Sequence, residues 1–97
     1  MGIKDLNIEQ FKKIINSEKV ILIDVRTEEE YNKGHINGAI LIENYEIEYK
    51  IRKLEISKQD KIIVYCGSGM KSKNAQQILI NMGYENVYNV KNGIQNI

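Results

Sequence analysis

Residues 61–83 read KIIVYCGSGMKSKNAQQILINMG, and they join an apolar run, a glycine-rich turn and a helical pattern without a gap. The apolar run contains β-branched residues and is typical of a buried strand. Apolar residues then recur at helical spacing, in a helix that begins near Lys71 and ends at Gly83. The only cysteine of the chain, Cys66, lies between the two elements. The stretch therefore predicts a strand, a loop that carries a thiol, and a helix.

The loop that carries the thiol is suited to stabilise negative charge. Gly67 and Gly69 allow backbone conformations in which several N–H groups converge on one point. The following helix adds the positive end of its dipole, and both effects favour a thiolate. Lys71 adds a positive charge near the same point, and the hydroxyl groups of Ser68 and Ser72 are further hydrogen-bond donors. Most lone cysteines are small buried hydrophobic residues, but this setting indicates a functional one.

Strands and helices alternate along the rest of the chain. Asn7, Thr27 and Asn44 are N-cap residues that begin three predicted helices. The alternation predicts an α/β fold, namely an open, mainly parallel β-sheet flanked by helices on both faces. Asp24 and Cys66 each follow a predicted strand, so we expect both at the sheet edge where ligands bind. A single domain is expected over residues 1–97, with strands over 20–24, 39–42, 61–65 and 87–90 and helices over 8–15, 28–33, 47–54 and 71–82.

Composition argues against several classes of protein. The 97 residues carry a net charge of +1 from 14 basic and 13 acidic residues, without a basic stripe for nucleic acid. No apolar run approaches the ~20 residues of a membrane span, and the polar start lacks the apolar core of a signal peptide. A single cysteine allows no internal disulfide, which fits the cytoplasm. His35 is the only other soft ligand, so no metal site is expected, and we expect a monomer.

Two stretches resemble the signatures of the rhodanese-like sulfurtransferases, in their single-domain form. Residues 22–42, LIDVRTEEEYNKGHINGAILI, are similar to the first signature of that family. Residues 60–94, DKIIVYCGSGMKSKNAQQILINMGYENVYNVKNGI, are similar to the second. The two stretches follow one another in the order of the family and cover most of the chain from Val20 onward. The six-residue active loop of the family corresponds to Cys66–Lys71, followed by Ser72.

The resemblance implies the rhodanese-like fold and a sulfur-relay reaction. The Cys66 thiolate would take the outer sulfur of a small donor such as thiosulfate, and the loop amides would hold the persulfide. A thiol, a partner protein or cyanide would then accept the sulfur, without a metal or organic cofactor. By the same resemblance the catalytic residues are Cys66 and Lys71, and the substrate-binding residues are Gly67, Ser68, Gly69, Met70 and Ser72.

The loop departs from the family pattern in ways that leave the donor open. Gly67 and Lys71 stand where many thiosulfate sulfurtransferases carry arginine, so recognition of a dianionic donor is expected to be weaker. The first four loop residues, CGSG, are similar to those of mercaptopyruvate sulfurtransferases. Asn37 and Asn92 replace a proline and a glycine that are usual at two turns.

Three other functions compete with sulfur transfer. Dual-specificity phosphatases and arsenate reductases use a loop one residue longer that ends in arginine, whereas Ser72 occupies that seventh position here. A non-catalytic docking module would not need the cysteine, both glycines and a cation. A thiol redox sensor would use the same reactive thiol, and the sequence does not separate it from a sulfur carrier.

Four other polar or aromatic residues are interpreted as structural. Asp24 is expected to bond the backbone at the end of its strand, and Arg26 to pair with a glutamate at 29 or 30. His35 is expected to bond nearby backbone instead of acting as a base, and Tyr65 to pack in the core.

Overall fold

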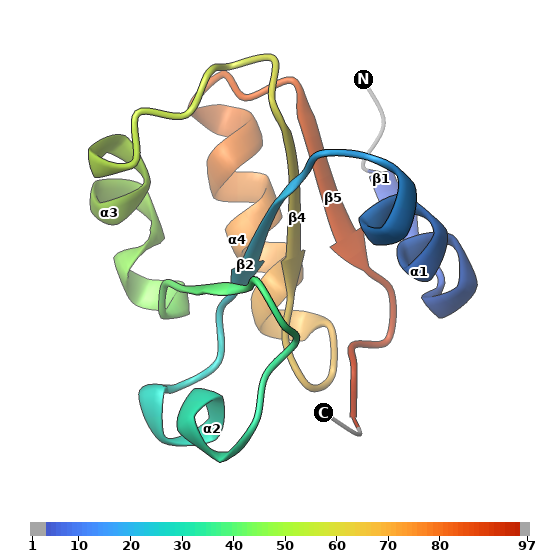
Figure 1. Ribbon diagram of the computed structural model, residues 1–97. Helices are drawn as coiled ribbons and strands as arrows, with labels where there is room; N and C mark the ends of the chain where they lie inside the picture. Colours follow the sequence, from blue (N-terminus) through green and yellow to red (C-terminus); the bar gives the residue numbers. More distant parts are fainter. Residues whose placement is uncertain (1–3, 96–97) are drawn as a thin grey trace.

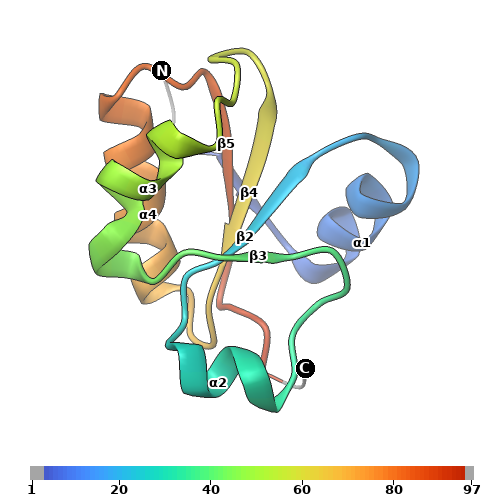
Figure 2. The same cartoon turned by 60° about the vertical axis from the view of Figure 1, so that its left-hand side comes forward.

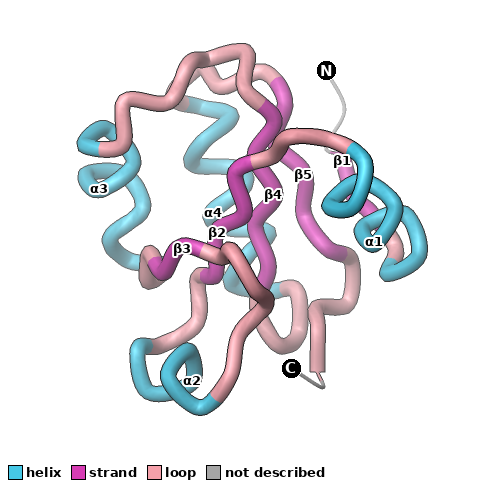
Figure 3. The backbone as a smooth tube through the Cα atoms, viewed as in Figure 1, coloured by secondary structure: helices cyan, strands magenta, loops and turns pink. Residues whose placement is uncertain are grey.

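The computed structural model describes residues 4–95, and a five-stranded sheet lies at their centre. All neighbouring strands are parallel, and the spatial order is β1-β5-β4-β2-β3 (Figure 3). The predicted α/β fold with an open parallel sheet is therefore confirmed. The strands are β1 (Lys4–Leu6), β2 (Ile21–Asp24), β3 (Ile40–Leu41), β4 (Lys61–Tyr65) and β5 (Asn86–Val90).

Helices cover both faces of this sheet, as the sequence predicts. One face is covered by α1 and the other by α3 and α4 (Figures 1 and 2). The short helix α2 lies beyond the end at which the strands finish (Figure 2). The helices are α1 (Ile8–Ser17), α2 (Glu28–Lys33), α3 (Ile47–Lys53) and α4 (Met70–Asn81), and a 3-10 turn, η1 (Asn44–Glu46), precedes α3.

The strand β4 shows why the sheet needs cover on both faces. Ile62 and Val64 pack in the core on the α4 side, together with Leu79 of that helix. Ile63 and Tyr65 point the opposite way and pack in a second core with Phe11 of α1. Successive side chains of a strand alternate between faces, so an uninterrupted apolar run is buried on both sides.

Several local predictions are confirmed at the helix ends. Asn7 and Thr27 both cap their helices and form complete capping boxes. After α4, Gly83 takes a positive φ of 102°. The Tyr84 N–H then donates to the Leu79 carbonyl, and the Tyr84 ring is buried. No helix among residues 4–95 is both long and apolar enough to cross a bilayer.

The structure differs from the sequence-based expectation at three places, one of them a strand that the sequence does not predict. The strand β1 was not predicted, because its stabilisation comes from backbone pairing with β5 and its first two residues are exposed. Asn44 does not cap a helix: it begins η1, with Glu43 before it and no side-chain cap. Leu54 follows α3 and is 39% exposed, so the buried side of that helix consists of Ile47 and Ile51.

Candidate active site

Cys66 lies between the end of β4 and the start of α4, with its side chain 2% exposed. The sulfur accepts the Gly69 N–H at 3.1 Å and the Ser72 N–H at 3.4 Å. Gly69 precedes α4 with a left-handed φ of 91°, which favours glycine. Ser72 is the third residue of α4, and N–H groups in the first turn have no partner within the helix. The loop therefore turns free amides toward the sulfur.

The Ser72 hydroxyl completes the surroundings of the sulfur, with its oxygen 3.4 Å from the Cys66 sulfur. Burial raises the pKa of the Cys66 thiol. Hydrogen bonds from the Ser72 side chain and from the backbone of Ser72, Gly69 and Ser68 lower this pKa, and together they outweigh the effect of burial. The net pKa is below the ordinary value of a cysteine. This direction agrees with the sequence-based expectation of a reactive thiol.

Residues 92–94, which follow β5, pack against the backbone of the loop. The Ile94 N–H donates to the Cys66 carbonyl at 2.9 Å. A Cβ atom on Gly93 would lie 2.2 Å from the Gly67 carbonyl oxygen, and one on Gly69 would lie 3.0 Å from the Asn92 nitrogen. These two glycines therefore allow close contact between the segment and the loop. Asn92 takes a φ of 63°, a conformation that asparagine tolerates well among non-glycine residues.

The other predicted loop residues lie around the thiol in different ways. The Ser68 backbone contributes to the low pKa of Cys66, but its hydroxyl accepts the Met70 N–H at 3.3 Å. None of the hydrogen bonds to the Cys66 sulfur described above comes from this hydroxyl. Gly67 is half-buried in the loop, and Met70 is 78% exposed at the start of α4.

Lys71 lies on the outer side of the loop. Its side chain is exposed and lines a pocket of about 160 Å³ together with Arg26, Thr27 and Tyr45. Its positive charge also contributes to the lowered pKa of Glu30, after the hydrogen bonds from Thr27. None of the hydrogen bonds to the Cys66 sulfur described above comes from the Lys71 ammonium group. Lys71 is therefore placed at the rim of the site instead of against the thiol.

A larger groove of about 510 Å³ runs along the other side of the loop. Ser68, Gly69 and Met70 form its wall on the loop side, and Lys73 and Lys91 add positive charge. Residues of the loop thus line two separate hollows, and Cys66 itself lines neither.

Two residues that the sequence analysis did not identify are connected to the thiol. The Ser72 hydroxyl donates to the side-chain oxygen of Asn89 on β5. The side-chain nitrogen of Asn89 donates in turn to Asp5 on β1 at 3.5 Å. A lone polar residue in a short strand gives no signal of this kind in the sequence. The connection depends on the pairing of β1 with β5, which brings Asp5 opposite Asn89.

A second polar cluster lies at the end of β2. The Asp24 carboxylate is fully buried and accepts bonds from the Arg26 backbone, the Arg26 guanidinium and the Tyr65 hydroxyl, at 2.7 to 3.1 Å. The expected bond from Asp24 to backbone is confirmed. The predicted partner of Arg26 is wrong, because the guanidinium pairs with Asp24 and also donates to the Gly34 carbonyl at 2.7 Å. Tyr65 packs in the core as predicted, but its hydroxyl also accepts the Ile36 N–H at 3.1 Å.

His35 has a structural position, as predicted. Its Nδ1 atom lies 2.9 Å from the Tyr31 carbonyl oxygen, and its ring stacks on the Tyr31 ring at 3.6 Å. Within residues 4–95 no three His, Cys, Asp or Glu side chains come together as a metal site would require.

Similarity to known proteins identifies the family of the chain. The family model of the Rhodanese-like domain matches residues 7–97. The chain belongs to the rhodanese-like family. A relative of this rhodanese-like chain, the thiosulfate sulfurtransferase GlpE of Pseudoalteromonas translucida, is 31% identical over 93 residues, which cover 96% of this chain and 87% of the relative.

Relatives and solved structures differ in how much of them the rhodanese-like chain covers. The tRNA uridine(34) hydroxylase of Cytophaga hutchinsonii is 33% identical over 94% of this chain, but the chain spans only 30% of that protein. The human single-domain sulfurtransferase TSTD1 superimposes with a TM-score of 0.84, covering 96% of this chain and 93% of the other. That structure is 23% identical, so it supports the fold alone.

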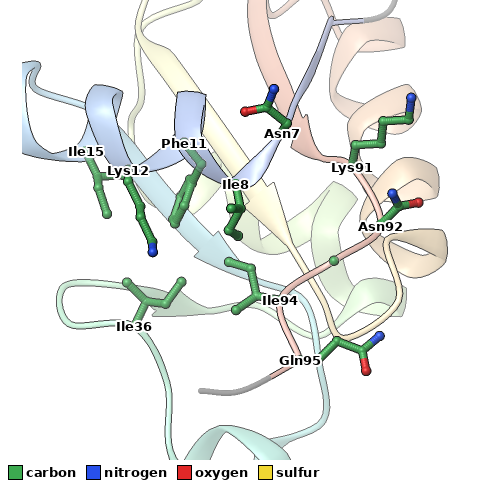
Figure 4. Close-up of a pocket in the computed structure, with 11 residues that line it drawn as sticks. Asn7, Ile8, Phe11, Lys12, Ile15, Ile36, Lys91, Asn92, Ile94 and Gln95 are labelled. Carbon is green, nitrogen blue, oxygen red and sulfur yellow. The ribbon is translucent and has the colours of Figure 1, made fainter.

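A further cavity of the rhodanese-like domain lies away from the thiol. It has a volume of about 690 Å³ and separates α1 from the segment after β5. Figure 4 shows Ile8 and Phe11 on one side of it and Ile36 and Ile94 on the other. Cys66 does not line this cavity. The loop around Cys66 is the candidate active site because its N–H groups converge on the sulfur and the pKa of the thiol is lowered.

Proposed function

We propose that this chain is a sulfurtransferase that carries a sulfane sulfur as a persulfide on Cys66. The observation that carries the proposal is the pair of N–H groups, from Gly69 and Ser72, that point at the buried sulfur. Hydrogen-bond donors fixed in advance stabilise an anion without reorganisation. These two donors stabilise the Cys66 thiolate, which is the nucleophile that takes up the sulfur. In the persulfide the negative charge lies on the outer sulfur, beyond the Cys66 sulfur. The relatives named thiosulfate sulfurtransferase support this reaction class.

Loading of the sulfur begins with the thiolate. The Cys66 sulfur attacks the outer sulfur of thiosulfate, a new S–S bond forms, and the bond from that sulfur to the sulfite group breaks. Sulfite leaves with the electron pair, and the negative charge of the enzyme moves to the outer sulfur of the persulfide. Total charge is conserved, and no metal, oxidant or reductant takes part.

Unloading reverses the roles of nucleophile and leaving group. An acceptor such as cyanide or a thiolate attacks the outer sulfur, and the S–S bond to Cys66 breaks. The products are thiocyanate or an acceptor persulfide, together with the regenerated thiolate. Since the chain has one cysteine, the acceptor must be a second molecule.

The remaining predicted residues are assigned to binding. We propose that the loop backbone at Gly67, Ser68 and Met70 holds the sulfur being transferred. Lys71, whose exposed side chain lies beside the loop, is proposed to attract the anionic donor by its charge. Such long-range attraction acts mainly on the rate of encounter and weakens as salt is added.

Intact-protein mass tests the proposal directly. Reduced protein is mixed separately with thiosulfate and with mercaptopyruvate, and cyanide is then added. We expect a gain of one sulfur with at least one donor and its removal by cyanide, with Cys66→Ser as a control that gains nothing. Absence of any gain from folded protein with a free thiol would overturn the proposal. A gain in Cys66→Ser would place the sulfur on another group and would overturn the assignment to Cys66.

A further inference from the structure

We infer that Asn89, oriented by Asp5, is a positioning residue that competes with the Cys66 thiolate for the single hydroxyl hydrogen of Ser72. This inference rests on the proposed function for its biological meaning, because it concerns the nucleophile of that reaction. It concerns two residues outside the active loop. Its test requires only the thiol and no sulfur donor.

The Ser72 oxygen lies between two groups that both need its hydrogen. It is 2.5 Å from the Asn89 side-chain oxygen and 3.4 Å from the Cys66 sulfur. All three side chains are at most 3% exposed, so bulk water does not replace a missing bond. A serine hydroxyl has one hydrogen to donate. Either Asn89 or the sulfur therefore receives it.

Asp5 determines which end of the Asn89 amide faces Ser72. A carboxylate only accepts hydrogen bonds, so the Asn89 nitrogen faces Asp5, at 3.5 Å. The Asn89 oxygen is then turned to Ser72 and has to receive a hydrogen. A buried carbonyl without a donor is unfavourable. While Cys66 is a thiol, Ser72 therefore donates to Asn89 and presents a lone pair to the sulfur. The Ser72 side chain lowers the pKa of Cys66 only when its hydroxyl turns to the thiolate and leaves Asn89.

This arrangement affects the states of Cys66 unequally. A thiol can donate its S–H to the Ser72 oxygen, so both bonds are made. The inner sulfur of a persulfide is uncharged and makes no demand on the Ser72 hydrogen. A thiolate, however, faces the lone pair, and the hydroxyl can turn to it only by leaving Asn89 without a donor. Asn89 and Asp5 thus reduce the stabilisation that the thiolate receives from its surroundings, whereas the thiol and the loaded form are unaffected.

Backbone amides and nearby charges set the background for this competition. The N–H groups of Gly69 and Ser72 point at the sulfur whichever way the hydroxyl turns. Asp24 and Arg26 neutralise one another in an ion pair, and Lys73 lies 3.7 Å from Asp5. The charged residues around the loop include Asp5, Asp24, Arg26, Glu30, Glu43, Lys71, Lys73 and Lys91.

The test compares thiol reactivity in a two-residue mutant cycle. The rate of alkylation by iodoacetamide is followed by intact-protein mass between about pH 5 and about pH 10. The dependence of this rate on pH gives the apparent pKa of the single cysteine. We expect Asn89→Leu, which keeps the volume and removes the acceptor, to lower that pKa by about one unit, or about tenfold in thiolate population. In the Ser72→Ala background the same substitution should have no effect. General damage to packing would change the pKa of Cys66 whether or not Ser72 is present, so a lowering that requires Ser72 points to the hydroxyl.

Other outcomes would overturn the inference. An unchanged or raised pKa in Asn89→Leu would do so, as would an equal shift in the presence and absence of Ser72. If Asn89→Leu does not fold, Asp5→Asn replaces it, since Asp5 lies exposed on an edge strand. This change lets the Asn89 amide turn over, so that Ser72 is free to donate to the sulfur. It should lower the pKa of Cys66 in the wild-type background and lower it severalfold less in the Ser72→Ala background. Failure of sulfur loading with an intact mutant cycle would overturn the proposed function alone.

Discussion

Two buried polar clusters lie at the ends of adjacent strands, and they use their hydrogen bonds differently. In the clamp cluster, Asp24, Arg26 and Tyr65, opposite charges meet through short bonds of 2.7 to 3.1 Å. In the thiol cluster, Cys66, Ser72 and Asn89, the sulfur has donors at 3.1 and 3.4 Å. No hydrogen bond to the sulfur described for residues 4–95 comes from a positively charged group.

The difference separates a structural role from a chemical one. The clamp cluster satisfies a buried carboxylate fully, and Arg26 and Tyr65 extend it to the backbone of Gly34 and Ile36. In the thiol cluster, the N–H groups of Gly69 and Ser72 both donate to the sulfur and stabilise a thiolate more than a neutral thiol. Tyr65 and Cys66 are neighbours in sequence and face opposite sides of the sheet. The clamp cluster therefore fixes the end of β4, from which the active loop begins.

Removal of the clamp carboxylate should have the largest effect on stability. Asp24→Ala leaves the Arg26 guanidinium and the Tyr65 hydroxyl without their main partner, and breaking a buried pair costs about 3–5 kcal/mol. Urea unfolding measures the loss. Glu29→Ala is the matched control, since this exposed glutamate was one of the predicted partners of Arg26. Equal losses in the two variants would contradict the clamp.

A smaller loss is expected when the clamp keeps its charges and loses one hydroxyl. Tyr65→Phe removes the bond to Asp24 and leaves the Ile36 N–H without an acceptor, a cost of about 1–3 kcal/mol. Burial, followed by the bond to Asp24, raises the pKa of Tyr65 above its ordinary value. The neutral tyrosine therefore stabilises the fold below about pH 10, and this stabilisation falls as the pH rises above that unfolded-state value. Urea unfolding from neutral to alkaline pH should show this decline in wild type and a weaker one in Tyr65→Phe.

The same two clusters show what sequence can predict. The run 62–65, the glycines around Cys66 and the helical spacing after it are local patterns, so the strand, loop and helix followed from neighbouring residues. The position of Cys66 and Asp24 at one edge followed from the parallel topology. The pairing of Arg26 with Asp24 was missed, because the sequence offers Glu29 and Glu30 as competing partners in the next turn.

Contacts between distant segments could not be predicted in the same way. Asp5 and Asn89 are 84 positions apart and meet only because β1 pairs with β5. The support of the loop by Gly93 depends on a backbone contact with Gly67, which no composition or spacing reveals. Short polar strands add little apolar burial, so their pairing is set by the rest of the sheet.

Replacement of the thiol should give a loss of function with little loss of stability. Cys66→Ser should abolish sulfur transfer and change the free energy of unfolding by about 1 kcal/mol or less at neutral pH, because shape and backbone bonds are kept. The pKa of Cys66 is lowered on folding, so the thiolate adds stability above the unfolded-state pKa of ~8.5, and this is lost as the pH falls through the folded value. Wild type should therefore gain stability over Cys66→Ser as the pH rises through that window. A difference that shrinks with rising pH would contradict the lowered pKa.

The smallest effect is expected at the rim of the site. Lys71→Ala removes an exposed charge that lies beside the loop and bonds to neither cluster, so stability should stay within about 0.5 kcal/mol. We expect loading by thiosulfate to require a severalfold higher donor concentration, with the difference shrinking as salt screens the charge. Lys13→Ala on the exposed side of α1 is the control and should behave as wild type. If Lys71→Ala instead abolished loading at saturating donor and high salt, the lysine would act on the reacting sulfur itself, and the amides of Gly69 and Ser72 would not suffice.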